Sequence, residues 1–342
     1  MRGAIVGFGT IATGHLIAYN EMRDIKIIAV IDPVPTRRQL AREMAPGINT
    51  YSTIEDMFRS EQVDFIDICS PPCSHRMYIH TGLRNNCHVL CEKPLLLSSD
   101  EYKGLLLLEG SKIVYPSHNY KFSPVIRQVV KCLQSAKMGE IFRGHFRTLR
   151  SGHAHGVSDW NPDWRRDPKI AGGGILYDHG PHSIYLACHM CGKIPTAVSC
   201  VIGTLDAPER FTTEDTSLLT IDFDGIKWVI DLTWASSLRN TYYAVNSRGG
   251  AIIVENDLMV CVNNETGYSE ATIISEFDDP LHRSWFKDMI TDFLHAITHP
   301  DRRNPLLLEA LTISLVIEAA YTSAANRGVW TDVPLPSIEY LL

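Results

Sequence analysis

The first 32 residues place two apolar runs on either side of a short glycine motif. The run Ala4–Val6 leads into Gly7-x-Gly9-x-x-Ala12, and the run 25–31 ends at Asp32. A strand that turns into a helix through such glycines lets a diphosphate approach the backbone at the helix N-terminus, and an acid about 20 residues later binds an adenosine ribose. The pattern predicts the first β–α–β unit of a parallel sheet, with a dinucleotide site formed by Gly7, Gly9, Thr10, Ile11 and Asp32.

Strand and helix patterns alternate over the first third of the chain. Apolar strand runs lie near 2–7, 26–31, 64–69, 87–91 and 113–117, and helical patterns begin near residues 10, 36, 53, 74 and 98. This order is typical of a doubly wound α/β sheet, whose ligand lies at the carboxyl ends of the strands. Pro71 and Lys93 each follow a strand end, so we expect both at that edge.

Beyond about residue 140, strands follow one another without helices between them. They are predicted at 141–149, 196–203, 217–224, 227–233, 242–247 and 251–255, with helices near 284–297 and 305–326. Alternating residues between Trp228 and Trp234 form one markedly apolar face, which is typical of an antiparallel sheet. We expect a helix layer or a subunit interface to bury that face, and a turn at Gly249-Gly250 to join two of the strands.

Composition restricts the classes of partner. The 342 residues favour two domains, and 45% apolar with 21% charged residues is ordinary for a globular protein. The net charge of −7 is spread along the chain, so neither nucleic acid nor a membrane surface is an expected partner. No apolar run approaches a membrane span of about 20 residues, and the chain starts with its first strand, which predicts a cytoplasmic protein.

The nine cysteines are scattered over apparent strands and helices rather than regularly spaced in loops. This distribution favours reduced thiols that pack as small apolar groups. Cys188 and Cys191 have the spacing of a metal or redox pair, but no second pair completes a tetrahedral zinc site. We therefore expect neither zinc nor a disulfide there.

Two groups of residues carry side chains suited to proton and hydride chemistry. Lys93 ends a predicted strand, where its ammonium can stabilise an alkoxide. The glycine run 172–174 precedes a helical pattern in which Asp178 and His182, four residues apart, share one face. A carboxylate beside an imidazole orients it and raises its basicity, as a general base requires. Pro181 lies inside this predicted helix and should bend it.

Four motifs occur together in a fixed order along most of the chain. They are Gly7-Phe-Gly-Thr-Ile-Ala12, Ser70-Pro-Pro-Cys-Ser-His75, Glu92-Lys93-Pro94 and Gly172-Gly-Gly-Ile-Leu-Tyr-Asp178-x-Gly180-x-His182. Together they resemble the Gfo/Idh/MocA family of oxidoreductases. The resemblance implies an NAD(P)-binding Rossmann domain, residues 1–120, and a C-terminal α/β domain, residues 121–342, which binds substrate. The second domain would contain a large, mostly antiparallel open sheet that forms homodimer or homotetramer contacts, and its last helix could pack back on the first domain.

The resemblance also implies roles by position. Lys93, Asp178 and His182 match the family's catalytic residues, and the residues that match dinucleotide contacts are Ser70, Pro71, His75, Glu92, Lys93 and Asn119. The implied reaction exchanges a hydride between nicotinamide and a hydroxyl or keto carbon of a sugar, sugar derivative or cyclitol. Family members often have Asn-Arg-Arg-Phe where this chain has Asn119-Tyr-Lys-Phe122, so Tyr120 or Lys121 near the substrate would alter which hydroxyls are recognised.

Asp32 decides the expected cofactor. Its carboxylate should accept the adenosine ribose hydroxyls and repel a 2′-phosphate, which favours NAD. Arg37 and Arg38 follow closely enough to bind such a phosphate if Asp32 turned aside, so NADP is the less favoured alternative.

The segment before the glycine run offers substrate contacts. Trp164 could stack on a sugar ring and Arg165 could bind hydroxyls or a phosphate, although a packing tryptophan and a surface arginine fit equally well. His153 and His155, with Asp159 nearby, have a spacing that is common in loops, and we expect no metal there.

Two other functions share the predicted fold. The first is a redox-neutral glycosidase that uses bound NAD transiently, and the second is a non-catalytic regulator that senses dinucleotide levels. The presence of Lys93, Asp178 and His182 argues against a sensor, because a sensor needs none of them.

Overall fold

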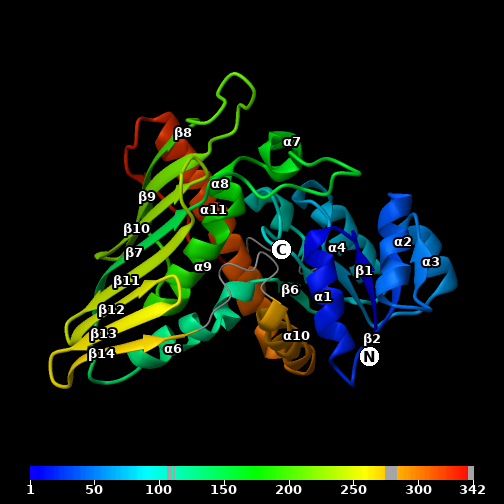
Figure 1. Cartoon of the computed structure of the whole chain (residues 1–342), viewed down its shortest axis with the longest axis horizontal. Coiled ribbons are helices and arrows are strands. Elements are labelled where there is room, and N and C mark those ends of the chain that lie inside the picture. Colours follow the sequence, from blue (N-terminus) through cyan, green and yellow to red (C-terminus); the bar gives the residue numbers. More distant parts are fainter. Residues whose placement is uncertain (106–109, 111, 274–282, 338–342) are drawn as a thin grey trace.

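The computed structural model describes residues 1–105, 110, 112–273 and 283–337 (Figure 1). Over these residues the first sheet has six parallel strands in the order β3-β2-β1-β4-β5-β6. Their bounds are β1 Arg2–Val6, β2 Lys26–Ile31, β3 Asn49–Tyr51, β4 Phe65–Ile68, β5 His88–Cys91 and β6 Val114–Pro116. The strand order reverses beside β1, so the predicted doubly wound sheet is confirmed.

Helices connect these parallel strands as the sequence predicts. They are α1 Thr10–Asn20, α2 Pro35–Met44, α3 Ile54–Ser60 and α4 His75–Arg84. The side chain of Thr53 caps α3 by accepting a hydrogen bond from the backbone N–H of Asp56. The helix expected from residue 98 begins as a 3₁₀ turn, Ser99–Tyr102, and much of its remainder lies outside the described residues.

The second sheet contains nine strands in the described residues, in the order β14-β13-β12-β11-β7-β10-β9-β8-β15. Only β7 and β10 pair in parallel there, so the sheet is mostly antiparallel, as predicted. The predicted turn at Gly249-Gly250 joins β11 to β12. The bounds are β7 Ile141–Leu149, β8 Ala197–Gly203, β9 Thr216–Phe223, β10 Ile226–Thr233, β11 Asn240–Ser247, β12 Gly250–Glu255, β13 Leu258–Asn263, β14 Gly267–Thr272 and β15 Thr331–Asp332.

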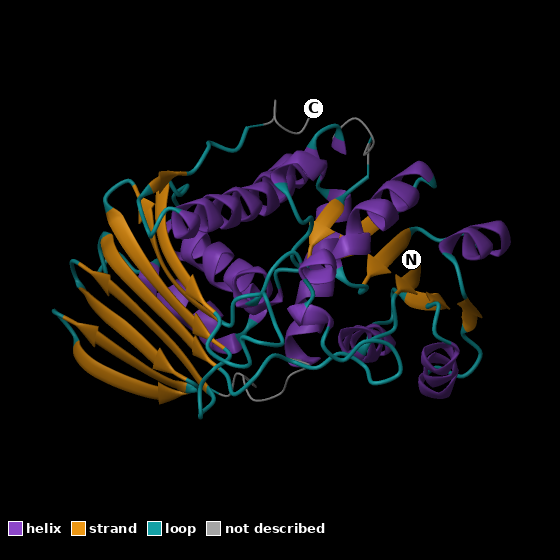
Figure 2. Ribbon diagram, turned by 90° about the horizontal axis from the view of Figure 1, so that it is seen from above, coloured by secondary structure: helices purple, strands orange, loops and turns teal. Residues whose placement is uncertain are grey.

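Helices cover one face of this second sheet (Figure 2). They include α6 Pro124–Leu133, α9 Gly180–Cys191 and α11 Arg303–Ala325. Trp228 and Trp234 are buried on the covered face, so the helix layer accounts for their burial without a subunit interface. The opposite face carries exposed apolar side chains from several strands, namely Val201, Leu218, Ile253 and Val262.

The last two described helices bridge the sheets. Helix α10, Arg283–Thr298, packs on α1, and α11 contacts both β8 and β6. Contrary to our expectation from the apolar runs, Pro300–Ala325 is long and apolar enough by composition to span a membrane. However, 67% of its most apolar window is buried inside the fold, as in a core helix.

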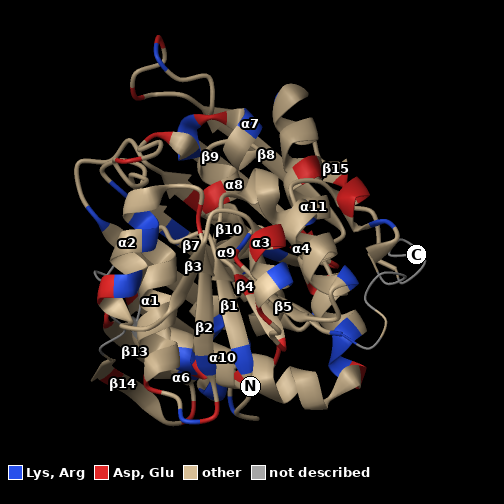
Figure 3. Cartoon of the chain, turned by 90° about the vertical axis from the view of Figure 1, so that its right-hand side faces the viewer, with Lys and Arg blue, Asp and Glu red and all other residues tan. Residues whose placement is uncertain are grey.

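Lys and Arg residues lie among Asp and Glu residues along the ribbon in Figure 3. Helices α2 and α3 each contain residues of both signs, whereas the charged residues of α4 are Arg76 and Arg84. This distribution agrees with the absence of a basic run in the sequence.

Candidate active site

Gly7 and Gly9 shape the turn between β1 and α1. Gly7 has φ +83°, and a Cβ there would lie 2.8 Å from the backbone of Ser70, so only glycine fits this close approach. A Cβ on Gly9 would meet no described atom within 4 Å. Thr10 and Ile11 open α1, whose N-terminus receives no side-chain cap from the described residues. Uncapped N–H groups beside open space suit a diphosphate.

The carboxylate of Asp32 is fixed beside that turn. Its Oδ2 accepts a hydrogen bond from the backbone N–H of Phe8 at 2.7 Å, and its Oδ1 accepts one from Val34 at 2.8 Å. Burial raises the pKa of Asp32, while these backbone donors act in the opposite direction. Each oxygen retains capacity to accept a ribose hydroxyl. Arg37, a candidate partner of a 2′-phosphate, has its Nε 3.5 Å from Oδ2 of Asp159.

The segment after β4 forms the neighbouring part of the edge. Ser70 and Pro71 lie there as predicted, and Oγ of Ser70 is 2.7 Å from Oγ of Ser74. The structure corrects the expected role of His75, which is fully buried. Its Nε2 is 2.8 Å from the carbonyl of Ser70 and its Nδ1 is 2.9 Å from that of Pro94. His75 therefore ties two edge loops together rather than presenting an atom to a ligand.

Glu92 is part of a buried polar network that the sequence did not predict. Its Oε1 accepts a hydrogen bond from Ser117 at 2.7 Å and lies 3.4 Å from Nε2 of His15. Nδ1 of His15 lies 2.8 Å from Asp67. Burial alone would raise the pKa of Glu92, but His15 and Ser117 lower it. Asn119 opens a buried 3₁₀ turn, Asn119–Phe122, after β6.

Lys93 and Asp178 meet between the two sheets. Nζ of Lys93 donates to the backbone carbonyl of Asp178 at 2.6 Å and to its Oδ1 at 2.9 Å. The two side chains are 15% and 13% exposed. Burial alone would raise the pKa of Asp178, but Lys93 and Arg165 hold it well below its usual range. The structure thus brings together two residues that the sequence predicted as catalytic and that lie 85 positions apart.

The single bent helix predicted around Pro181 was wrong. Asp178 ends one short helix, α8 Ile175–Asp178, and a separate helix, α9, begins at Gly180. Pro181 lies in the first turn of α9, where its missing N–H would have no intrahelical partner, so it starts the helix instead of bending it.

This break changes the partner of His182. Its Nδ1 lies 2.7 Å from the hydroxyl of Tyr185, and its ring centroid lies 4.1 Å from that of Tyr120. The imidazole beside the carboxylate of Asp178 belongs to His179, with Nδ1 3.2 Å from Oδ2. The prediction that Asp178 orients His182 through the helical spacing was therefore wrong, and Tyr185 holds Nδ1 of His182.

Each glycine of the run before α8 lies where a side chain would clash. Gly172 has φ +88°, and a Cβ on Gly173 would lie 2.1 Å from the hydroxyl of Tyr321. A Cβ on Gly174 would lie 1.8 Å from the carbonyl oxygen of Glu214. Oε1 of Glu214 also accepts hydrogen bonds from the backbone N–H groups of Gly174 and Leu176, each at 3.0 Å. Glu214 thus clamps the turn that leads to Asp178.

Arg165 reaches the same carboxylate as Lys93. Its Nε is 3.5 Å from Oδ1 of Asp178, and its Nη1 donates to the carbonyl of Ala154 at 2.9 Å. The guanidinium lies 4.2 Å above the ring of Trp164. The predicted pair Trp164 and Arg165 therefore lies next to the Lys93–Asp178 ion pair.

The histidines of the preceding loop have a different acidic neighbour from the one expected. Nε2 of His153 and Nδ1 of His155 lie 3.1 and 3.4 Å from Oδ1 of Asp163. Asp159 points to α2 instead and accepts a hydrogen bond from the hydroxyl of Thr36. All nine cysteines, including Cys188 and Cys191, are free thiols.

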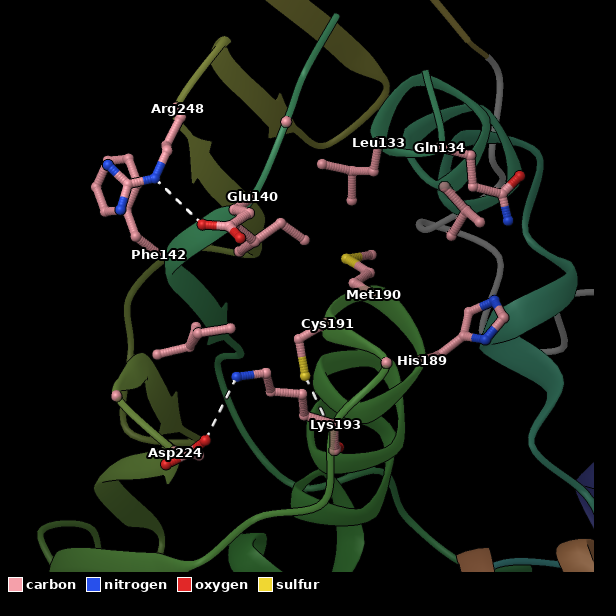
Figure 4. Close-up of a pocket in the computed structure, with 16 residues that line it drawn as sticks. Leu133, Gln134, Glu140, Phe142, His189, Met190, Cys191, Lys193, Asp224 and Arg248 are labelled. Atoms are coloured by element: carbon pink, nitrogen blue, oxygen red, sulfur yellow. Dashed lines mark hydrogen bonds and ion pairs between the residues drawn. The ribbon is translucent and has the colours of Figure 1, made fainter. Parts of the chain in front are cut away.

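A hollow of about 590 Å³ lies away from Lys93 (Figure 4). It is lined by α6, the end of α9 and turns of the second sheet. Its charged side chains pair with one another: Lys193 lies 3.8 Å from Asp224, and Arg248 lies 3.2 Å from Glu140. These exposed pairs make useful controls for the buried Lys93–Asp178 pair.

Two family models match successive parts of the chain. The oxidoreductase family with an NAD-binding Rossmann fold matches residues 1–115, and the GFO/IDH/MocA C-terminal domain matches residues 126–252. The chain belongs to the Gfo/Idh/MocA family of oxidoreductases. This membership confirms the resemblance and the fold class that the four motifs predicted.

Two curated relatives of this Gfo/Idh/MocA protein are named as dehydrogenases. D-glucoside 3-dehydrogenase of Escherichia coli (strain K12) is 27% identical over 259 residues, which cover 70% of this chain and 72% of the relative. D-apiose dehydrogenase of Rhizobium rhizogenes is 24% identical over 344 residues, which cover 95% and 96%. The solved complex of levoglucosan dehydrogenase with NADH and levoglucosan has a TM-score of 0.85 at 19% identity. The match covers 98% of this chain and 99% of the levoglucosan dehydrogenase chain, so the two proteins share a fold.

The Gfo/Idh/MocA protein is therefore an enzyme with an NAD-binding Rossmann fold, of the class that acts on CH–OH groups. Its own residues fit that cofactor. The close approach at Gly7, the open space at Gly9 and the fixed carboxylate of Asp32 suit a dinucleotide.

The clamp at Gly174 gives a test of how this Gfo/Idh/MocA enzyme positions Asp178. We expect Gly174→Ala to lower the free energy of unfolding by about 2 kcal/mol, because the new methyl group overlaps a backbone oxygen. We also expect kcat/KM to fall, because Asp178 lies one turn later. Gly152→Ala is the control, since Gly152 faces open space in the described structure. Equal urea midpoints for the two variants would contradict this prediction.

Proposed function

We propose that the protein transfers a hydride between NAD and a hydroxyl-bearing carbon of a sugar, sugar derivative or cyclitol. The single observation that carries this proposal is the Lys93–Asp178 ion pair at the edge of the NAD-binding sheet, with His182 on the adjoining helix. The relatives' names support the substrate class, since D-glucoside 3-dehydrogenase and D-apiose dehydrogenase are both named for sugars.

In this proposal the cofactor is held by chain elements at the carboxyl edge of the first sheet. Bound NAD supplies the acceptor of the hydride. The glycine turn with Thr10 and Ile11 would bind the diphosphate, and Asp32 would bind the adenosine ribose. Ser70, Pro71, Glu92 and Asn119 line the neighbouring strand ends and would contact the rest of the dinucleotide.

Lys93 would stabilise the oxygen of the reacting carbon. Its described contacts with Asp178 use two of the three ammonium hydrogens, so one remains for the substrate. Asp178 fixes the direction of that hydrogen by holding the ammonium from one side, and Arg165 lies against the same carboxylate. An ammonium already oriented toward developing negative charge costs no reorganisation during the reaction.

His182 would take the proton of the substrate hydroxyl. If Nδ1–H donates to Tyr185, the lone pair of Nε2 is the base, and the reverse transfer protonates the alkoxide when a ketone is reduced. Tyr120 packs on this imidazole and Arg165 lies near Asp178, so both are placed to contact hydroxyls of the substrate. Trp164, under the Arg165 guanidinium, would form an apolar part of the same wall.

We also propose that the open face of the second sheet forms the contact of a homodimer or homotetramer. The exposed apolar residues of that face support it, because isolated apolar surface of this extent favours association. Nine free thiols agree with a reducing compartment such as the cytoplasm.

An assay of purified protein with NAD and a panel of aldoses, cyclitols and glycosides tests the proposal. We expect NADH absorbance to rise with at least one polyol in the panel. Release of a free sugar from a glycoside without net NADH would favour the redox-neutral glycosidase instead. NAD binding without turnover of the whole panel, together with unchanged behaviour of Lys93→Met, would favour a sensor.

A further inference from the structure

The segment 150–163 crosses from the second sheet to the nucleotide-binding sheet. It follows β7, and in Figure 1 the green segment before α7 extends toward α2. Asp159 makes the contact at its far end. Its Oδ2 accepts a hydrogen bond from the hydroxyl of Thr36 and lies 3.5 Å from Nε of Arg37. A residue from the substrate-binding half thus reaches the turn that follows Asp32.

The contact brings a carboxylate to a helix terminus that has no acidic residue in its own first turn. Helix α2 has ten residues, no acidic residue in its first turn and no side-chain cap among the described contacts. Thr36 and Arg37 belong to that first turn, so the carboxylate of Asp159 provides the negative charge that a helix N-terminus favours. Arg37 is 17% exposed at its side chain, and its buried Nε makes no hydrogen bond in the described structure. Its attraction to Asp159 is therefore mainly electrostatic.

These donors are the ones that a 2′-phosphate would need. The phosphate of NADP is attached to the ribose that Asp32 is positioned to bind, so its partners must come from the residues just after Asp32. Arg38 is already engaged, because its Nη1 donates to the carbonyls of Asp32 and Pro33 at 2.7 and 2.9 Å. Thr36 and Arg37 carry further side-chain donors at the start of α2, and Asp159 contacts both.

We propose that Asp159 is a specificity-determining residue that excludes NADP, because its carboxylate lies on the hydroxyl and guanidinium donors that a 2′-phosphate would otherwise use. The inference rests on the proposed placement of the dinucleotide. Asp159 acts in two ways: it repels the phosphate directly, and it neutralises the arginine that would attract the phosphate.

Binding measurements on Asp159→Asn test the inference without relying on turnover. Calorimetric titration with NAD and with NADP gives the ratio of the two dissociation constants. We expect Asp159→Asn and Asp159→Ser each to shift that ratio toward NADP by about tenfold, since one charge is removed near the phosphate. The shift should shrink as salt is added, because exposed charges are screened. Arg37→Gln combined with Asp159→Asn should abolish the gain.

Asp163→Asn is the matched control. Asp163 lies in the same loop with a similar exposed fraction, but its partners are His153, His155 and Arg210 rather than the nucleotide-binding sheet. We expect the ratio of the NAD and NADP dissociation constants to be the same in Asp163→Asn as in the unaltered protein. The inference is overturned, while the proposed function stands, if the unaltered protein binds NAD and both Asp159 variants have the same ratio of NAD to NADP dissociation constants as the unaltered protein. If the unaltered protein binds neither nucleotide, the cofactor placement and the inference fail together.

Discussion

Lys93→Met is expected to lower kcat/KM by on the order of 10³-fold, because it removes the only charged group that we place against the reacting oxygen. Methionine keeps much of the side-chain length but cannot donate a hydrogen bond or carry charge. The affinity for NAD should change little, since the Gly7 turn and Asp32 remain intact. Steady-state kinetics with a substrate found in the panel, together with NAD titration, measures both effects.

Lys193→Met is the control for Lys93→Met. Lys193 also pairs with an aspartate, but it lies on the hollow of Figure 4 and is exposed. We expect its kcat/KM to match that of the unaltered protein. If Lys93→Met retains more than about a tenth of the original kcat/KM, Lys93 does not take part in the reaction, because such groups contribute larger factors than that.

Asp178→Asn should lower the free energy of unfolding by about 3 kcal/mol. The substitution leaves the mostly buried Lys93 and Arg165 without their shared counter-charge, and loss of one member of a buried pair is strongly destabilising. Asp224→Asn breaks the exposed Lys193–Asp224 pair and should cost less than about 0.5 kcal/mol. Urea unfolding of the two variants shows whether the loss of stability comes from breaking any ion pair or specifically from breaking a buried one. Similar midpoints would show that the Lys93–Asp178 pair is not important for stability.

Because Asp178 is ionised in this pair, we expect the free energy of unfolding to depend on pH. The pKa of Asp178 in the folded protein lies well below its ordinary value of 3.8. The ionised Asp178 carboxylate therefore makes its full contribution to the free energy of unfolding at pH values above 3.8. That contribution is lost as the pH falls through the lower pKa that Asp178 has in the folded protein. The stability difference between the unaltered protein and Asp178→Asn should narrow as the pH is lowered below about 4. A constant difference across this range would contradict the assigned ion pair.

Much of the active-site edge was predictable because parallel strands impose their own geometry. Strands β1, β2, β4 and β5 run in the same direction, so whatever follows each strand arrives at one edge. Gly7 and Asp32 come directly after such a strand, and Ser70 and Lys93 lie two residues after one. Local apolar runs and glycine spacing were therefore sufficient to place them together.

The partners of His182 were not predictable in the same way. The rule that residues four apart share a helix face holds only within one helix, and Gly180 starts a new one. Glu214 and Asp159 act across 40 and 123 positions of sequence, and no local pattern specifies such contacts. The short strand β3 and the outer strands β13 to β15 were also missed, since very short strands and exposed hairpins have weak apolar periodicity. Helix α6 was missed too, although Val125, Ile126 and Val129 have the spacing of one buried helix face.

The hydrophobic core beside α1 needs side chains from α10, which is synthesised long after the first sheet. Phe286, Ile290 and Phe293 of α10 are fully buried in one cluster with Phe8 and Leu16 of the nucleotide-binding half. A ribosome that has released the first 120 residues has therefore made all six strands of that sheet but not the side chains that seal its α1 face. We expect the first 120 residues to remain loosely packed until α10 has been synthesised and can supply these side chains.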